Sequence, residues 1–327
     1  MPYKMTKAKN KSFHVLVTGG AGFIGSHLCE ALLSRNYRVW CVDNLYLGRE
    51  EFIEHLKSNP RFDFRNLDLL DKPKLESLFG EVGFDAVFHL AANSDIQRGV
   101  KDHSIDLNLN FLTTVNVLEA MRSAGVKTII FPSSSAVFGE TDDVLTEDYG
   151  PMKPVSFYGA SKLAAEAYIS VFVGNYGFNA RVIRFPNVIG ERCTHGVVHD
   201  FIKRLKNDSS RLAVLGNGKQ TKPYLYVGDL VVAILLVFDR ASDPLEVYHV
   251  GNEDRTSVAE IVKIVLEEMN LTGIPVEYTG GSGGWAGDVP RFQYDIGKIK
   301  SLGFKQSYSS TESVRIAVRR ILETPWL

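Results

Sequence analysis

A cluster of glycines near the start of the chain constrains the fold more than any other feature. In the segment VLVTGGAGFIGSHL, residues 15–28, a strand-like apolar run stops at Gly19, and Gly22 and Gly25 open a helical stretch. Glycine lets the backbone turn sharply there and approach a phosphate, which then faces the unpaired N–H groups of a helix N-terminus. Asp43 ends the next apolar run, at the distance expected of an acid that binds ribose hydroxyls. The spacing predicts a dinucleotide site at the first strand–helix turn of a parallel sheet.

The charge of Asp43 indicates which dinucleotide is bound. A carboxylate accepts hydrogen bonds from the 2′- and 3′-hydroxyls of adenosine, and its charge repels a 2′-phosphate. NAD is therefore predicted as the cofactor in preference to NADP.

Short apolar runs alternate with longer stretches of helical period from Phe13 onward, which is typical of a parallel sheet covered by helices on both faces. We predict an α/β protein, a Rossmann-type doubly wound parallel sheet with a smaller C-terminal α/β region for substrate binding. The expected strands are 13–18, 37–42, 61–66, 86–91, 128–133 and 180–185, and the expected helices lie near 23–34, 72–79, 106–124 and 157–175.

The predicted domains follow from where this alternation stops. Residues 1–12 carry four lysines and no apolar run, and we expect a disordered tail. The NAD-binding domain spans 13–188, and 227–250 returns a helix and a strand to it. Glycine-rich turns and a long loop, 279–291, mark the smaller region, predicted over 189–226 and 251–327.

Composition narrows the class of protein further. With 327 residues and a formal net charge of -1, the chain has no basic field to attract nucleic acid or an anionic membrane surface. The longest apolar run, 230–238, is too short to cross a bilayer. Three widely spaced cysteines, Cys29, Cys41 and Cys193, argue against disulfides and zinc, and favour a cytoplasmic location.

Histidines give no sign of a metal site. His89, His195 and His199 lack ligand spacing, so we expect structural roles for them and predict no bound metal. For His199 the alternative is a place in the lining of the substrate pocket.

A second motif indicates proton chemistry on an alcohol. In SFYGASKLAAEAY, residues 156–168, Tyr158 and Lys162 stand four residues apart and share one helix face. An ammonium beside a phenol lowers the pKa of the phenol toward neutrality, as a general base requires. Upstream, FPSSSAVFG places three serines at a strand end, where a hydroxyl is able to share the substrate's hydrogen bond.

Taken in order, the motifs resemble the extended short-chain dehydrogenase/reductase family, in the branch of nucleotide-sugar epimerases and dehydratases that includes UDP-galactose 4-epimerase. The resemblance runs from Phe13 to about Phe304 and includes TGGAGFIG, HLAA, NFLTTVNVLEA, YGASK and RFPNVIGER. It implies Tyr158, Lys162 and Ser134 as catalytic residues. It implies cofactor contacts from Gly19, Gly22, Phe23, Ile24, Gly25, Asp43, Asn44, Asp68, Leu69, Leu90, Ala91, Ala92, Asn110, Tyr158 and Lys162.

The same resemblance implies a nucleotide-diphosphate sugar as substrate. Its expected contacts are Ser94, Ser134, Ser135, Asn187, Arg192, Val198, Lys222, Trp285 and Arg291. Three of these depart from the family pattern: Lys222 and Trp285 stand where phosphate-binding arginines are usual, and Ser94 stands where some epimerases have a lysine that touches the substrate. Arg192 and Arg291 are candidates to compensate, and Trp285 either stacks on the ligand or caps the core.

The resemblance also bears on the reaction. In the dehydratases two acids follow the catalytic Ser/Thr, whereas Ser135 and Ala136 occupy those positions here. The implied activity is an NAD-dependent 4-epimerase, in which a hydride leaves C4 and returns to the opposite face. The alternatives are a nucleotide-sugar 4-dehydrogenase or ketoreductase, a decarboxylase, for which no cation is evident, and a non-catalytic NAD-binding protein. A homodimer through the helices near 106–124 and 157–175 is expected.

Overall fold

Seven parallel strands form the central sheet of the molecule. The computed structural model describes residues 13–281 and 293–324. The strand order is β12-β7-β5-β4-β1-β2-β3, and every neighbouring pair is parallel, which confirms the predicted Rossmann-type sheet. Its strands are β1 (His14–Thr18), β2 (Arg38–Asp43), β3 (Phe62–Asn66), β4 (Ala86–His89), β5 (Thr128–Ser134), β7 (Asn179–Phe185) and β12 (Leu245–His249).

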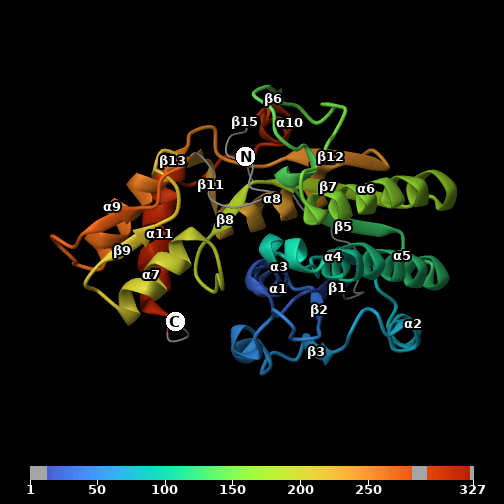
Figure 1. Ribbon diagram of the computed structural model, residues 1–327. Coiled ribbons are helices and arrows are strands. Elements are labelled where there is room, and N and C mark those ends of the chain that lie inside the picture. Colours follow the sequence, from blue (N-terminus) through green and yellow to red (C-terminus); the bar gives the residue numbers. More distant parts are fainter. Residues whose placement is uncertain (1–12, 282–292, 325–327) are drawn as a thin grey trace.

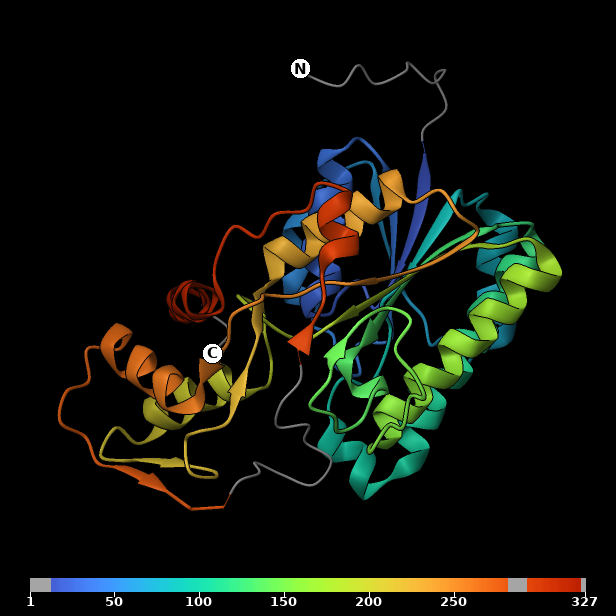
Figure 2. The ribbon, with the colours of Figure 1, turned by 90° about the horizontal axis from the view of Figure 1, so that it is seen from above.

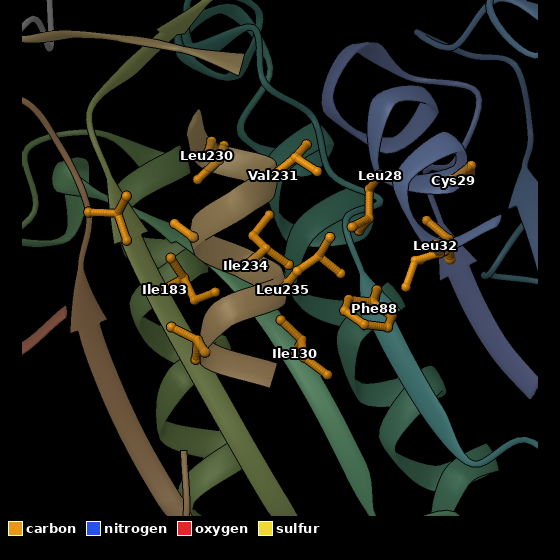
Figure 3. Packing of buried hydrophobic residues seen from close by; sticks show 14 of the residues in the cluster. Leu28, Cys29, Leu32, Phe88, Ile130, Ile183, Leu230, Val231, Ile234 and Leu235 are labelled. Carbon is orange, nitrogen blue, oxygen red and sulfur yellow. The ribbon is translucent and has the colours of Figure 1, made fainter. Parts of the chain in front are cut away.

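Helices cover both faces of this sheet because its strands are apolar on both sides. On one face Leu28 of α1 and Ile234 of α8 pack with Phe88 and Ile130 of the sheet (Figure 3). On the other face a second cluster joins the sheet to the remaining long helices through residues such as Leu118. The helices are α1 (Phe23–Ser34) and α8 (Val227–Arg240) on the first face, and α2 (Lys72–Glu81), α5 (Thr113–Ala124) and α6 (Phe157–Tyr176) on the second.

The helix predicted over 106–124 is interrupted in the structure. A short α4 (His103–Asp106) passes into a π-helical turn, η3 (Leu107–Leu112), before α5 begins. The hydroxyl of Thr114 donates to the carbonyl of Asn110 at 2.6 Å, so a side chain ties down part of the widened turn. This irregularity faces the site described below, because Leu109 and Thr113 line its cavity.

The smaller region lies beside the carboxyl edge of the sheet and has its own core (Figures 1 and 2). Three helices enclose that core: α7 (Val197–Asn207), α9 (Val258–Glu268) and α11 (Ser310–Glu323). Capping boxes begin two of them, with Ser257 paired to Glu260 and Ser309 to Glu312. Short paired strands complete the region: β8 (Asn187–Ile189) with β11 (Tyr224–Tyr226), β9 (Leu212–Val214) with β14 (Val276–Tyr278), and β10 (Thr221–Lys222) with β13 (Thr256–Ser257).

The remaining elements are short. They are α3 (Ile96–Lys101), α10 (Gly297–Ser301), the pair β6 (Val144–Leu145) and β15 (Gln293–Tyr294), and the 3₁₀ turns Glu50–Phe52, Glu54–Leu56 and Ser135–Val137. Helix α8 packs on the large sheet, and strand β12 pairs with β7 in it. The exact division into domains stays a prediction. No helix among the described residues is long and apolar enough to cross a membrane.

Candidate active site

The glycine turn forms a close-fitting cradle at the end of β1. Gly19 has φ +67°, and a Cβ there would lie 2.6 Å from the backbone nitrogen of Ala91. A Cβ on Gly25 would collide with the carbonyl oxygen of Gly19. Helix α1 begins without a side-chain cap, so its first N–H groups face the turn. The geometry fits a pyrophosphate held by backbone N–H groups against a helix N-terminus.

Asp43 lies beside this cradle at the end of β2. Its Oδ2 accepts from the N–H of Ala21 at 3.0 Å, and its Oδ1 accepts from the N–H of Leu45 at 2.8 Å. Burial raises the pKa of this carboxyl, and the two backbone donors oppose the shift. Asn44 donates to Asp68 at 3.3 Å, which joins the ends of β2 and β3. The acid expected to bind ribose is therefore fixed in place by the glycine loop itself.

A cavity of about 720 Å³ runs along the carboxyl ends of the strands and continues into the smaller region. This is the crevice in which open α/β sheets bind ligands. Among the residues predicted for the cofactor it is lined by Gly19, Gly22, Phe23, Ile24, Gly25, Asp43, Asn44, Asp68, Leu69, Leu90, Ala91, Ala92, Tyr158 and Lys162.

The predicted catalytic residues meet on one wall of this cavity. Ser134 ends β5, and Tyr158 and Lys162 lie on the first turns of α6, which the hydroxyl of Ser156 caps. The phenol of Tyr158 forms a hydrogen bond with Ser134. The ammonium of Lys162 donates to the carbonyl of Pro132 at 3.0 Å. A hydroxyl, a phenol and an ammonium are thus gathered beside the cofactor half of the cavity.

Burial dominates the ionisation of this group. It raises the pKa of Tyr158 to about 12, although the hydrogen bond from Ser134 lowers it in part. It lowers the pKa of Lys162 to about 8, against the carboxylates of Glu166 and Asp106. The expectation that the phenol's pKa lies below its usual value is therefore wrong here, because desolvation of the phenolate is the largest effect.

Asn110 does not line the cavity, unlike the other residues predicted for the cofactor. It is buried in the π-helical turn, where its side chain accepts from the N–H of Asn93 at 2.6 Å and donates to Asp106 and Ser161, both at 3.0 Å. These contacts hold the loop after β4 and the start of α6 in register. The side chain of Asn110 therefore bonds to other residues of the protein and does not reach the cavity predicted for the cofactor.

His89 is buried, and each ring nitrogen shares a hydrogen bond with a hydroxyl: Nδ1 with Thr18 at 2.7 Å and Nε2 with Thr114 at 3.0 Å. Burial lowers its pKa to about 3, so the ring is neutral. These contacts agree with a structural role. Among the described residues no cluster of His, Cys, Asp or Glu is placed to hold a metal ion.

The substrate half of the cavity gathers most of the residues predicted for it. Ser94, Ser134, Ser135, Asn187, Val198 and Lys222 line the cavity. Arg192 does not, because its guanidinium binds Glu30 of α1 at 2.5 Å and Ser26 at 3.1 Å. Trp285 and Arg291 lie outside the described residues. Of the two arginines expected to compensate for missing phosphate contacts, Arg192 is turned toward the glycine helix instead.

Several lining residues were not predicted as ligand contacts. Cys193, His195, His199, Arg204 and Gln220 all line the cavity, and of these only His199 was considered, as an alternative, for the substrate pocket. The first three follow the RFPNVIGER segment within eight residues, and that proximity was the available signal. The ring of His195 bonds to the backbone of Ser94, from the loop after β4. A purely structural role for His195 and His199 is therefore incomplete, since both border the ligand space.

Known proteins of the same architecture identify the family. The NAD dependent epimerase/dehydratase family matches residues 15–251, well over half of the chain. The chain belongs to this family. Its cofactor is NAD, and it is an enzyme of the extended short-chain dehydrogenase/reductase type.

Individual relatives differ in the reaction they are named for. A UDP-glucose 4-epimerase of Mycolicibacterium smegmatis is 34% identical over 75% of this chain and 79% of that protein. A UDP-N-acetyl-alpha-D-glucosaminuronate decarboxylase of Bacillus cytotoxicus is 31% identical over 88% and 90%. The structure of a Thermus thermophilus UDP-glucose 4-epimerase with NAD superposes with a TM-score of 0.85, at 31% identity, over 95% of this chain and all of that one. The sequence similarity establishes the family. The reaction within the family has to be inferred from the residues of the site.

Proposed function

We propose that the protein is an NAD-dependent nucleotide-sugar 4-epimerase. The observation that carries the proposal is the joint placement of Ser134, Tyr158 and Lys162 on the wall of one cavity, next to the glycine cradle. The cavity continues past them into the smaller region, so an alcohol carbon beside Tyr158 has room for a nucleotide behind it. A secondary alcohol of a nucleotide sugar is the substrate class that fits.

Each residue has a defined task in this proposal. Tyr158 takes the proton of the C4 hydroxyl, and Ser134 holds the same oxygen through its own hydroxyl. Bound NAD supplies the acceptor and donor of the C4 hydride and, when oxidised, a positive charge near the phenol. Lys162, with a pKa of about 8, is protonated at neutral pH and adds a second positive charge. These charges oppose the burial that otherwise keeps Tyr158 protonated.

The neighbouring positions favour epimerisation over elimination of water. Ser135 and Ala136 follow Ser134 along the cavity wall, where the related dehydratases have acids. Neither side chain supplies a carboxyl group for general acid–base work. Among the described lining residues the only lysine and arginine side chains are Lys162, Arg204 and Lys222, and Arg204 is already bonded to the carbonyl of Ala213 at 2.8 Å. The described lining therefore offers few cationic side chains to bind the carboxylate of a sugar acid, which disfavours decarboxylation.

The substrate half is proposed to hold the nucleotide diphosphate. Asn187 on β8 and Lys222 on β10 face the cavity from two different short strands, and Val198 adds an apolar wall on α7. A lysine provides a point charge in place of the two-pronged contact of an arginine. The grip on the diphosphate is therefore expected to differ from that of relatives with arginine at this position.

The test is conversion of a substrate panel without added cofactor. Purified protein is incubated with UDP-, GDP-, CDP- and dTDP-sugars, and the anomeric signals are followed by NMR. An epimerase gives the C4 epimer of at least one sugar and needs no added NAD. A 4-dehydrogenase or ketoreductase gives no C4 epimer under these conditions, and in a parallel incubation with NAD or NADH added it causes net reduction or oxidation of that cofactor. The absence of both across the panel contradicts the proposal and favours a non-catalytic NAD-binding protein.

The matched control for this experiment is Tyr158→Phe, which removes only the hydroxyl. We expect turnover to fall by at least about a thousandfold, while NAD content stays at the wild-type level. Unchanged turnover would exclude Tyr158 as the base.

A homodimer in the cytoplasm is the proposed working form. Large apolar side chains stand exposed along α6 and the adjoining turn, including Leu112, Phe157, Tyr168 and Val171. A second copy that packed its own α5 and α6 there would cover them. Light scattering in solution tests this, with Val171→Asp expected to yield monomers. The three cysteines are free, which is compatible with a reducing compartment.

A further inference from the structure

The loop between β8 and α7 borders the ligand cavity and is also fastened to the helix of the glycine cradle. Its last four residues, 193–196, all line the cavity. The residue before them, Arg192, lies outside the cavity and bonds to α1. The mechanism proposed above gives this loop no task.

Three hydrogen bonds hold the loop against α1. The guanidinium of Arg192 donates to the hydroxyl of Ser26 at 3.1 Å and to the carboxylate of Glu30 at 2.5 Å. One residue earlier, the backbone carbonyl of Glu191 accepts from Nε2 of His27 at 3.2 Å. Ser26, His27 and Glu30 lie in the first two turns of α1, directly after the glycine cradle. The loop is therefore attached to the helix whose N-terminus fits a pyrophosphate.

The surroundings and the backbone of Arg192 explain why an arginine stands there. Its side chain is only 14% exposed, so its ion pair with Glu30 is partly protected from screening by salt. Its φ of +65° is left-handed, which a residue with a Cβ seldom adopts unless surrounding contacts impose it. Glycine would take this backbone without strain. The side-chain contacts with α1 are thus what arginine contributes at this position.

The same loop is attached at two further points. The carboxylate of Glu191 accepts from the hydroxyl of Tyr226 on β11 at 2.9 Å, in the smaller region. The ring of His195 bonds to the backbone of Ser94, in the loop after β4. The backbone of the loop after β4 also lies against the first glycine of the cradle. Residues 190–196 therefore run from the smaller region to α1 and on to the loop after β4, and they bridge two elements that border the cradle.

We infer that Arg192 is a positioning residue that fastens residues 190–196 as a strap across the cavity, and that this strap slows the release of NAD. For NAD to leave freely, Arg192 has to give up its contacts with Ser26 and Glu30. An epimerase needs slow release, because the reduced cofactor has to stay bound until the hydride returns to the sugar. The inference rests on the proposed function only for this purpose.

The first test is the exchange of bound NAD in Arg192→Gly, which removes the contacts with α1 and suits the left-handed backbone. Protein loaded with NAD is mixed with an excess of deuterated NAD, and the bound cofactor is followed by mass spectrometry. Exchange is expected to be at least about tenfold faster than in the wild type, because two charge-assisted hydrogen bonds are lost.

The matched control is Arg35→Met. Arg35 at the end of α1 pairs with Asp239 on α8 at 2.7 Å, so the variant also removes an ion pair of this helix but leaves the strap attached. Its exchange is expected to equal that of the wild type. A wild-type exchange rate in Arg192→Gly, or the same acceleration in both variants, would overturn the inference.

The second test removes the partner of Arg192 instead. Glu30→Gln is expected to exchange NAD about threefold faster than the wild type, because one charge of the pair is lost. If Arg192 and Glu30 act through one contact, the double variant exchanges NAD no faster than Arg192→Gly alone. Accelerations that multiply in the double variant would overturn the inference. Should Arg192→Gly fail to fold, Glu30→Gln decides alone, and a wild-type rate in it overturns the inference.

These measurements need no turnover, so the strap and the proposed reaction fail separately. Faster exchange in variants of a protein that converts no sugar would support the strap and contradict the epimerase. In an active protein, the activity that Arg192→Gly loses on dilution is expected to return when NAD is added. A loss that persists at saturating NAD would indicate a general structural role for Arg192 and overturn the inference.

Discussion

Replacing Gly19 by alanine tests the glycine cradle in a way that the structure makes quantitative. The new Cβ would stand 2.6 Å from the nitrogen of Ala91 and 2.8 Å from its Cα, roughly 0.8 Å inside an ordinary contact. The left-handed φ of +67° adds strain of about 1 kcal/mol. Pushing the loop away from β4 costs about 2 kcal/mol more in the bound form, by the usual cost of overpacking. NAD affinity is expected to fall about thirtyfold through this second effect.

The assay measures both NAD released from purified protein by denaturation and the affinity for added NAD by calorimetry. Gly125→Ala is the matched control, because Gly125 has φ +75° and no described atom within 4 Å of a new Cβ. It carries the backbone strain without the collision, so it is expected to lose about 1 kcal/mol of stability and no affinity for NAD. Wild-type NAD affinity in Gly19→Ala, or an equal loss in both variants, would refute the cradle.

Three further predictions follow from buried or charged groups. Asp43→Asn is expected to raise the ratio of NADP to NAD affinity by about tenfold, since the charge that repels a 2′-phosphate is gone; calorimetry with both cofactors measures it. Burial raises the pKa of the Cys193 thiol from 9.0 to about 11, so alkylation at pH 8 should be about 100-fold slower than for a free thiol, as peptide mapping would show. Burial lowers the pKa of both His89 and His249 to about 3, so the unfolded chain binds more protons below pH 6.5. The free energy of unfolding should therefore fall by about 2 kcal/mol per histidine between pH 7 and pH 5, in urea titrations; a flat profile would contradict neutral buried rings.

The features that depend on only a few adjacent residues could be predicted from the sequence. The turn around Gly19, the strand that ends in Asp43, and the shared face of Tyr158 and Lys162 each arise from a few adjacent residues. The predicted strands of the large sheet are all present with ends within a few residues, because each is a continuous apolar run.

Other features depend on contacts between segments that are distant in sequence, and these could not be predicted from the sequence. Arg192 was predicted to contact the substrate from its position in the RFPNVIGER motif. Its guanidinium instead binds Glu30, which is distant in sequence, and so lies outside the cavity. Asn110 in the π-helical turn bonds to Asn93 and Ser161, in two other segments of the chain, and no helical period reveals these contacts. The raised pKa of Tyr158 reflects burial, and burial of a single side chain is set by the whole fold.

The most direct test of the account is the fate of the C4 hydrogen. A nucleotide sugar found to be turned over is prepared with deuterium at C4 and converted in ordinary water, without added NAD, and the product is examined by NMR. Proton transfer through Tyr158 and return of the same hydride predict a C4 epimer that keeps its deuterium. Loss of the label to solvent, or its appearance in free NADH, would contradict the epimerase mechanism.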